Sequence, residues 1–185
     1  MQNNRTLIGW VTVYCLLAAV VVIVTRSPQQ QRQSGQQPHQ QSTQQAEVAT
    51  LSRVIDGDTV VIHIPPTNEI HVRLIGIDAP ERGQAFYAEG RAYLGTVLSG
   101  AAITVASNGV DRYGRTLATL YIGETNVCLQ MIQSGLAWHF KKYSDDPVLS
   151  LAEHDAKKRR VGIWQQTNPV PPWEYRNKRT SANAR

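Results

Sequence analysis

Residues 73–81 of this chain read Arg73-Leu74-Ile75-Gly76-Ile77-Asp78-Ala79-Pro80-Glu81. The segment places one guanidinium and two carboxylates on a backbone whose other side chains are mostly apolar. Apolar residues in such a short run are typical of a strand, and a proline is expected to end it because it lacks a backbone N–H donor. We therefore take Arg73, Asp78 and Glu81 as the first candidates for a functional site.

Two further polar turns carry the same kinds of side chain. An acidic turn, Asp56-Gly57-Asp58-Thr59, lies upstream, and a second arginine follows downstream in Asp111-Arg112-Tyr113-Gly114-Arg115. Carboxylate oxygens are ligands that a hard cation prefers, and a planar guanidinium can bind two phosphate oxygens at once. The combination indicates phosphodiester chemistry.

Each of these residues also has a simpler interpretation. Taken singly, Asp58 and Asp78 are ordinary turn formers. Arg73 is expected to make a structural ion pair, and Arg115 and Glu81 are expected to be surface charges. Taken together, the five residues favour a site. Asp58 and Asp78 would hold the cation. The two arginines would stabilise the charge that builds on the phosphate during attack, and Glu81 would orient or deprotonate a water.

The hydrophobic pattern predicts an α+β fold that is mainly β. Alternation predicts strands over 60–64, 70–74, 103–106 and 117–122, and helical spacing predicts a helix over 86–98. Asn126 and Asp146 are expected to cap two later helices, which end near Gly135 and Gly162. The tail from Gln165, which is rich in proline, is expected to be irregular and then frayed. These elements fit an OB-type barrel, with five strands in Greek-key order and three helices.

The N-terminal part has a different composition. Leu7 to Val24 is an apolar run without a charge, flanked by Arg5 and Arg26, and no convincing cleavage site follows it. We expect an uncleaved signal anchor, with a cleaved secretion signal as the alternative. Residues from Ser27 onward are dominated by Gln and favour a flexible tether, with a polar binding tract as the alternative.

The chain therefore divides into four predicted regions. These are a single membrane helix over 1–26, a linker over 27–46, a folded domain over 47–166 and a basic tail over 167–185. We expect the domain to be exported to the cell envelope or beyond. The net charge of +5 favours an anionic partner. The two cysteines, Cys15 and Cys128, are not expected to pair, and no Cys or His cluster has the spacing of a zinc site.

Four motifs in the same order and spacing are similar to the staphylococcal-nuclease-like (thermonuclease) family. They are Val54-Ile55-Asp56-Gly57-Asp58-Thr59, residues 73–81, residues 111–115 and Gly135-Leu136-Ala137-Trp138. The resemblance covers about Val48 to Trp164. It implies an OB-type barrel with three helices, and calcium-dependent hydrolysis of both DNA and RNA that leaves 3′-phosphate ends.

The resemblance also implies roles for individual residues. Calcium would be held by the side chains of Asp58 and Asp78 and by the carbonyl of Ala79, with Asp56 beside these ligands. Arg73, Glu81 and Arg115 match the catalytic positions. Substrate contacts are expected from Tyr113, Arg112, Tyr143 and Lys141.

We expect a monomeric endonuclease that prefers single-stranded or locally melted nucleic acid. The competing interpretation is a non-catalytic OB-type module that binds nucleic acid while tethered to the membrane. A third is a tethered scaffold whose barrel binds a protein, for which the sequence offers no positive signal.

Overall fold

The computed structural model describes residues 48–66 and 68–183. The predicted membrane helix (1–26) and the predicted linker (27–46) lie outside the described residues. Within the described ranges, no helix is both long enough and apolar enough to cross a membrane.

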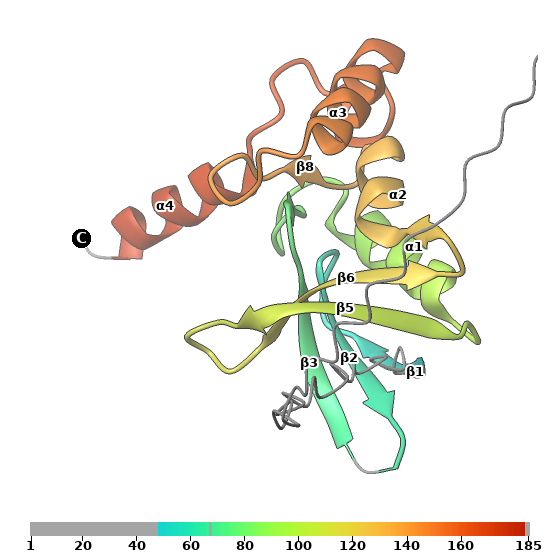
Figure 1. Cartoon of the computed structure of the whole chain (residues 1–185). Coiled ribbons are helices and arrows are strands. Elements are labelled where there is room, and N and C mark those ends of the chain that lie inside the picture. Colours follow the sequence, from blue (N-terminus) through green and yellow to red (C-terminus); the bar gives the residue numbers. More distant parts are fainter. Residues whose placement is uncertain (1–47, 67, 184–185) are drawn as a thin grey trace, which may run out of the picture. The chain divides into compact units, whose positions relative to one another are not determined.

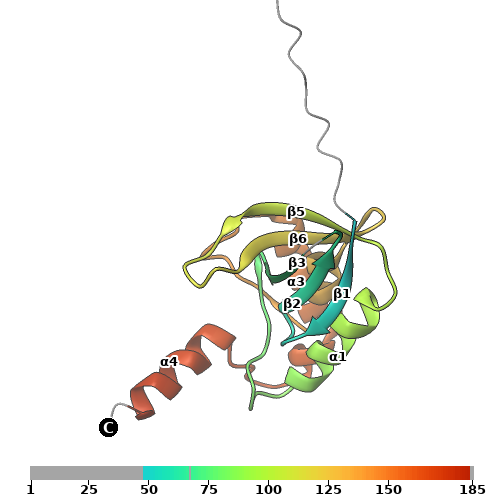
Figure 2. The ribbon, with the colours of Figure 1, turned by 90° about the horizontal axis from the view of Figure 1, so that it is seen from below.

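Five strands close into a barrel (Figures 1 and 2). They are β1 (Val48–Val54), β2 (Thr59–Ile64), β3 (Asn68–Leu74), β5 (Ile103–Val110) and β6 (Thr116–Ile122). Their order is β3-β2-β1-β5-β6 with antiparallel neighbours, and a parallel pairing of β3 with β6 closes the circle. The predicted five-stranded barrel is confirmed.

Three short strands complete the sheets. Strand β7 (Thr125–Asn126) extends β6 at its edge. Strands β4 (Ile77–Asp78) and β8 (Trp138–His139) pair with each other, so that Asp78 lies opposite Trp138. This small sheet holds the backbone of one acidic residue against a segment about sixty residues further along the chain.

The described residues form four α-helices and one short 3-10 helix. They are α1 (Tyr87–Leu98), α2 (Val127–Gln133), α3 (Pro147–Arg159), η1 (Gly162–Gln165) and α4 (Pro172–Asn183). Both predicted caps are confirmed: the Asn126 side chain accepts from the Leu129 N–H at 3.1 Å, and that of Asp146 accepts from the Val148 N–H at 2.7 Å. Each cap satisfies a donor that the first helical turn leaves unpaired.

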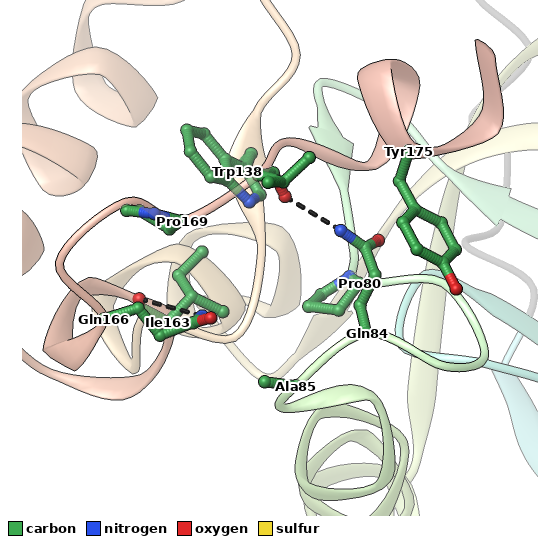
Figure 3. A pocket seen from close by; sticks show the side chains of 9 residues that line it. Pro80, Gln84, Ala85, Trp138, Ile163, Gln166, Pro169 and Tyr175 are labelled. Carbon is green, nitrogen blue, oxygen red and sulfur yellow. Dashed lines mark hydrogen bonds between the residues drawn. The ribbon is translucent and has the colours of Figure 1, made fainter. Parts of the chain in front are cut away.

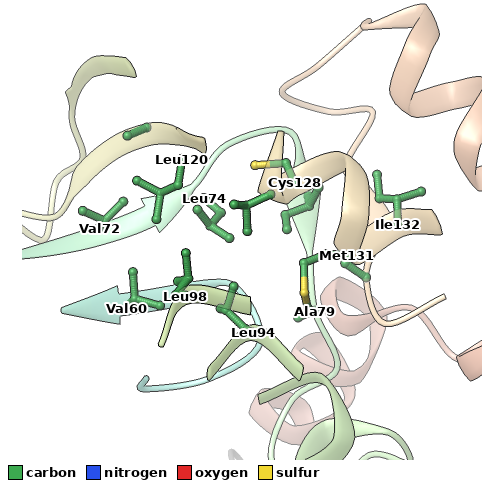
Figure 4. Packing of buried hydrophobic residues seen from close by; sticks show 14 of the residues in the cluster. Val60, Val72, Leu74, Ala79, Leu94, Leu98, Leu120, Cys128, Met131 and Ile132 are labelled. Atoms are coloured by element: carbon green, nitrogen blue, oxygen red, sulfur yellow. The ribbon is translucent and has the colours of Figure 1, made fainter. Parts of the chain in front are cut away.

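The core lies between the barrel and two of the helices (Figure 4). Strand residues Val60, Val72 and Leu74 are buried there together with Leu94 and Leu98 from α1, and Met131 and Ile132 from α2 belong to the same cluster. Since Val72 and Leu74 point inward, Arg73 between them points to the other side of β3, as its period predicts.

Two glycines fix the junction between α2 and η1. Gly135 has φ +66° and Gly162 has φ +54°, and the Ile163 N–H donates to the Gly135 carbonyl at 2.8 Å. A Cβ at Gly135 would overlap the carbonyl oxygen of Val161. Only glycine allows this backbone conformation and this close approach together.

The sequence-based prediction for the tail is wrong, because α4 occupies most of it. The three prolines at 169, 171 and 172 suggested an irregular segment. However, Pro172 is the first residue of the helix, where its missing N–H leaves no bond unmade, and Glu174 lies in the first turn, where a negative charge is favoured. The three helices predicted for the folded domain are confirmed as α1, α2 and α3, and α4 is a fourth helix, in the tail.

Candidate active site

The two acidic turns converge on one point. Asp58 Oδ2 lies 3.1 Å from Nη2 of Arg73, and Asp78 Oδ1 lies 3.0 Å from the same nitrogen. Both carboxylates are buried, and Asp78 is only 1% exposed. Two negative charges held this close and out of water require cations around them.

Close packing of the turns fixes the position of Asp58. Its Oδ2 accepts from the Ala79 N–H at 2.7 Å, and its Oδ1 accepts from the Thr59 hydroxyl at 3.1 Å. A Cβ at Gly57 would lie 2.7 Å from the Cβ of Ala79, so this approach depends on glycine at position 57.

Asp56 lies behind Asp58 and supports the turn. Its Oδ1 accepts from the Asp58 N–H at 3.1 Å. Burial, with a smaller contribution from the Asp58 charge, raises the pKa of Asp56 to about 6. Burial likewise raises the pKa of Asp78, although hydrogen bonds and charge from two arginines oppose that rise. Keeping these carboxylates ionised is therefore unfavourable in free energy, and a bound cation would offset that cost.

Arg73 forms ion pairs with Asp58 and Asp78, which agrees with the simpler, structural interpretation of this residue. Besides its contacts with the two carboxylates, its Nη1 donates to the carbonyls of Leu74 at 2.8 Å and Ile77 at 3.0 Å. Its side chain is 14% exposed. This guanidinium is thus fixed in position at the centre of the site, and a fixed donor is also what a phosphate-stabilising role needs.

Arg115 lies directly before β6 and approaches the turn that holds Asp58 and Thr59. Its Nε and Nη2 both lie 2.8 Å from Asp111 Oδ2, and its Nη1 is 3.5 Å from the Thr59 hydroxyl, which bonds Asp58. Asp111 Oδ1 also accepts from the N–H groups of Tyr113 and Arg115. One carboxylate therefore shapes the turn and aims the guanidinium.

Tyr113 and Arg112 form the exposed edge of that turn. Nη2 of Arg112 donates to the Tyr113 hydroxyl at 2.6 Å, and both Arg112 and Arg115 lie over the Tyr113 ring. The ring is largely exposed. The pair can offer a hydroxyl, a guanidinium and an aromatic face to a ligand.

Glu81 is joined to Asp78 through Arg176. Its backbone N–H donates to Gln84 Oε1 at 2.8 Å, and its Oε1 accepts from Nη1 of Arg176 at 2.6 Å. Arg176 also bonds Asp78, so the same guanidinium joins two of the predicted site residues.

Two predicted substrate contacts lie in the loop after β8. Lys141 Nζ is 3.4 Å from the buried carboxylate of Glu153, and the exposed Tyr143 ring packs edge-on against Phe140. Within the described residues, no hydrogen bond or ion pair joins either side chain to Asp58 or Asp78. The structure thus brings together seven of the predicted residues: Asp56, Asp58, Arg73, Asp78, Ala79, Glu81 and Arg115.

A cavity of about 190 Å³ adjoins Glu81 (Figure 3). Pro80, Gln84 and Trp138 line it, together with residues that lead into α4. Gln84 bridges the two segments, because its Nε2 donates to the Val170 carbonyl at 2.8 Å while its Oε1 holds the backbone of Glu81.

Sequence reasoning missed Arg176, which is the one charged side chain of α4 described in contact with the carboxylates. Its contacts span 95 and 98 residues of sequence. The sequence did contain a signal for the helix, because a proline followed by an acidic residue marks a helix start. Trp173 and Arg176 are three residues apart, so a helix places them on one face.

The described residues contain no group of three or more His, Cys, Asp or Glu side chains arranged to hold a metal ion. Asp58 and Asp78 offer two carboxylates to a metal, and backbone carbonyls and water could complete an oxygen-only set. Such an oxygen-only set suits a hard cation held loosely.

Buried carboxylates beside fixed arginines on a closed barrel suit an enzyme that cleaves phosphodiesters. A family model described as "Staphylococcal nuclease homologue" matches residues 71–166. A protein named "Uncharacterized endonuclease" from Haemophilus influenzae is 34% identical over 134 residues, covering 72% of this chain and 75% of that protein.

A protein named "Micrococcal nuclease" from Shigella flexneri is 37% identical over 143 residues, covering 71% of this chain and 80% of that protein. A protein named "Uncharacterized endonuclease" from Escherichia coli O157:H7 is 34% identical over 128 residues, covering 69% and 83%. The chain belongs to the staphylococcal nuclease family, and it is a nuclease, that is, a phosphodiester hydrolase.

Proposed function

We propose that this chain is a calcium-dependent, sugar-nonspecific endonuclease that cleaves DNA and RNA and leaves 3′-phosphate ends. The observation that carries the proposal is the meeting of Asp58 and Asp78 at one point, with Arg73 between them. Arg115 reaches the same turn through Thr59. Carboxylates that can bind a cation and guanidiniums that can bind a phosphate therefore lie next to each other.

The residues present fit calcium. Asp58 and Asp78 would bind it by their side chains and Ala79 by its carbonyl, with Asp56 supporting the turn. Hard oxygen donors on separate turns leave room for water ligands, which calcium tolerates. Bound calcium would supply positive charge to the phosphate that is attacked.

The remaining steps fall to side chains of this chain. Arg73 and Arg115 would donate to the phosphate oxygens, on which negative charge grows as a water attacks in line. Glu81 would orient or deprotonate that water. The bond to the 5′ oxygen would break, which leaves the phosphate on the 3′ side.

Substrate would extend from this point over the exposed turn of Arg112 and Tyr113. An aromatic ring and a guanidinium can stack on bases of any sequence, which favours unpaired strands of DNA and RNA alike. Lys141 and Tyr143 would add contacts further along the strand. We propose that the nuclease acts as a monomer.

We also propose that residues 1–26 form a single membrane anchor and that the nuclease domain lies in the cell envelope or outside the cell. The support is the uncharged run from Leu7 to Val24. The full-length chain should sediment with membranes and should be open to protease from outside the cytoplasm. A soluble mature chain that starts near Thr25 would show a cleaved signal instead.

Digestion of plasmid DNA and of RNA by the full-length chain tests the proposed chemistry. Cleavage should require calcium, stop in excess EGTA and leave 3′-phosphates, which a 3′-phosphatase makes detectable by end-labelling. The matched control is Asp58→Asn, which keeps the size of a ligand but removes its charge. A wild-type chain that binds single strands yet shows no turnover at any calcium concentration would favour the non-catalytic binding module.

A further inference from the structure

Arg176 occupies the carboxylates that the proposed function assigns to the cation and to the attacking water. Its Nη1 and Nη2 lie 3.1 and 2.7 Å from Oδ1 and Oδ2 of Asp78, a two-pronged contact with one hydrogen bond to each oxygen. Nη1 also lies 2.6 Å from Glu81 Oε1. Burial alone would lower the pKa of Arg176, but the hydrogen bonds that it donates to Asp78 and Glu81, and their charges, raise that pKa above its ordinary value.

The first turn of α4 is anchored beside the site by its own contacts. The Trp173 ring stacks on Phe140, with ring centres 5.2 Å apart and planes 10° apart, and meets Trp138 edge-on. The Tyr175 hydroxyl is 3.5 Å from the Arg82 carbonyl. Beyond Arg176 the described part of the helix is exposed, and Figures 1 and 2 show its C-terminal end running away from the barrel.

The hold on α4 is therefore local. The two ring contacts of Trp173, the Tyr175 hydroxyl and one guanidinium fasten a helix that follows a segment containing Pro169 and Pro171. A side chain that is 41% exposed loses less on release than a fully buried one would. These contacts can be broken without disturbing the barrel.

Charge balance decides what a cation would do here. Three carboxylates, from Asp58, Asp78 and Glu81, meet two guanidiniums, from Arg73 and Arg176. A divalent cation added beside Asp78 would face Arg176 at close range. Like charges at that distance repel, and both compete for the same oxygens.

We infer that α4 is an autoinhibitory latch, in which Arg176 and a divalent cation bind Asp78 in mutually exclusive states. The inference rests on the proposed function, because it assigns the cation to Asp78. In the closed state Arg176 also withholds Glu81 from the attacking water, and Trp173 covers the Phe140 face beside it. Cation binding opens the latch, so part of the binding free energy is spent on releasing α4.

Calorimetric titration of the full-length chain with calcium alone, without nucleic acid, tests the latch. Arg176→Gln should tighten calcium binding by roughly 5- to 150-fold, the usual range of coupling between two sites. Trp173→Leu should also tighten it, although it changes no charge near Asp78. The matched control is Arg179→Gln, which removes a charge from the exposed part of the same helix and should leave the affinity unchanged.

Hydrogen–deuterium exchange distinguishes release of α4 from a simple effect of the Arg176 charge, because only release exposes the amides of the helix. Saturating calcium should raise the exchange of α4 amides in the wild type and leave those of α3 unchanged. Nuclease activity at limiting calcium should rise in Arg176→Gln, while kcat at saturating calcium stays within about twofold of wild type, well short of the loss expected for a catalytic donor.

Four results would overturn the latch. If calcium bound more tightly to Arg176→Gln but not to Trp173→Leu, Arg176 would act only through its charge near Asp78 and not as part of a latch. A fall of kcat at saturating calcium in Arg176→Gln would make it a substrate-contacting arginine. Equal calcium affinity in all four proteins would leave the proposed function intact and the latch refuted, whereas no calcium binding in any of them, with full activity in EGTA, would refute both.

Discussion

Replacing Arg73 with alanine should damage stability and catalysis separately. The change removes hydrogen bonds to the carbonyls of Leu74 and Ile77, and it removes one cation from Asp58 and Asp78. Breaking a buried ion pair on one side costs about 3–5 kcal/mol. Asp78 keeps Arg176 as a partner, so we expect the lower end, about 3 kcal/mol. For a domain of this size that corresponds to a fall in Tm of about 10 °C.

Calcium separates the two effects. It supplies positive charge to the same carboxylates, and a ligand present at 100 times its Kd stabilises by about 2.7 kcal/mol. In the variant Arg73 no longer competes with calcium for Asp58 and Asp78, so calcium should stabilise the variant more than wild type and the Tm difference should narrow in saturating calcium. In contrast, kcat should stay at least about a hundredfold low, because calcium does not replace a donor to the phosphate. KM should change much less.

Thermal unfolding and steady-state nuclease assays, each with calcium and with EGTA, measure these quantities. Arg73→Lys is the matched variant: it keeps the charge, but a single ammonium cannot reproduce the two-pronged geometry. It should recover much of the Tm and little of kcat. An unchanged Tm in Arg73→Ala would refute the proposed contribution of Arg73 to stability. Recovery of kcat by calcium would show that Arg73 acts only through the carboxylates.

Four further outcomes are expected. Wild-type cleavage should need calcium at about 0.1–1 mM, the range of weak extracellular sites, and full activity in EGTA would contradict this. Asp111→Ala should lower kcat about tenfold or more, with little change in Tm, because the Arg115 guanidinium loses the carboxylate that positions it. An unaltered kcat would show that Arg115 does not depend on Asp111 for its position. Gly135→Ala should cost about 1–3 kcal/mol in chemical unfolding, and an unchanged midpoint would contradict the overlap with Val161. Glu153 is buried, which alone would raise its pKa, but hydrogen bonds and charge from Lys157, the His139 N–H and Lys141 outweigh burial and lower it. Its contribution is therefore complete above the unfolded pKa of about 4.3, so Glu153→Gln should be less stable than wild type at pH 7, and the Tm gap should close as the pH falls below about 4.

Local signals in the sequence were sufficient for most of the fold. The alternation in β3, the two helix caps at Asn126 and Asp146, and the glycine stop at Gly135 each depend on neighbours within a few residues. The position of Arg73 on the outer side of β3 follows from the same two-residue period. Those predictions needed no knowledge of the packed structure.

The composition of the site was harder to predict, because it depends on contacts between distant segments. Asp58 and Asp78 were proposed as partners, but nothing local indicated that Gly57 must fit against Ala79 to bring them together. Asp111 could be recognised as a turn former, yet its grip on Arg115 depends on side-chain geometry. The catalytic roles of Glu81 and Arg115 stay predictions.

The tail was misjudged for a physical reason that also bears on the latch. Proline was treated as a helix breaker, although at the first helical position it favours the helix. The helix that results is polar and mostly exposed, so its own sequence gives it little stability. Its position depends on the stack of Trp173 on Phe140 and on Arg176, which no pattern within residues 167–185 could reveal.

Asp78 has two arginine partners, and their anchoring differs in a way that predicts which one yields. Arg73 belongs to strand β3, and its Nη1 is held by two backbone carbonyls that would lose a donor if it left. Losing such a buried bond carries a desolvation cost. Arg176 bonds carboxylates alone, and these would be satisfied by an incoming cation instead. Displacing Arg73 therefore leaves unpaired carbonyls, whereas displacing Arg176 leaves none. A divalent cation should accordingly enter on the side of α4, and in Arg176→Gln it should find that side open while Arg73 stays in place.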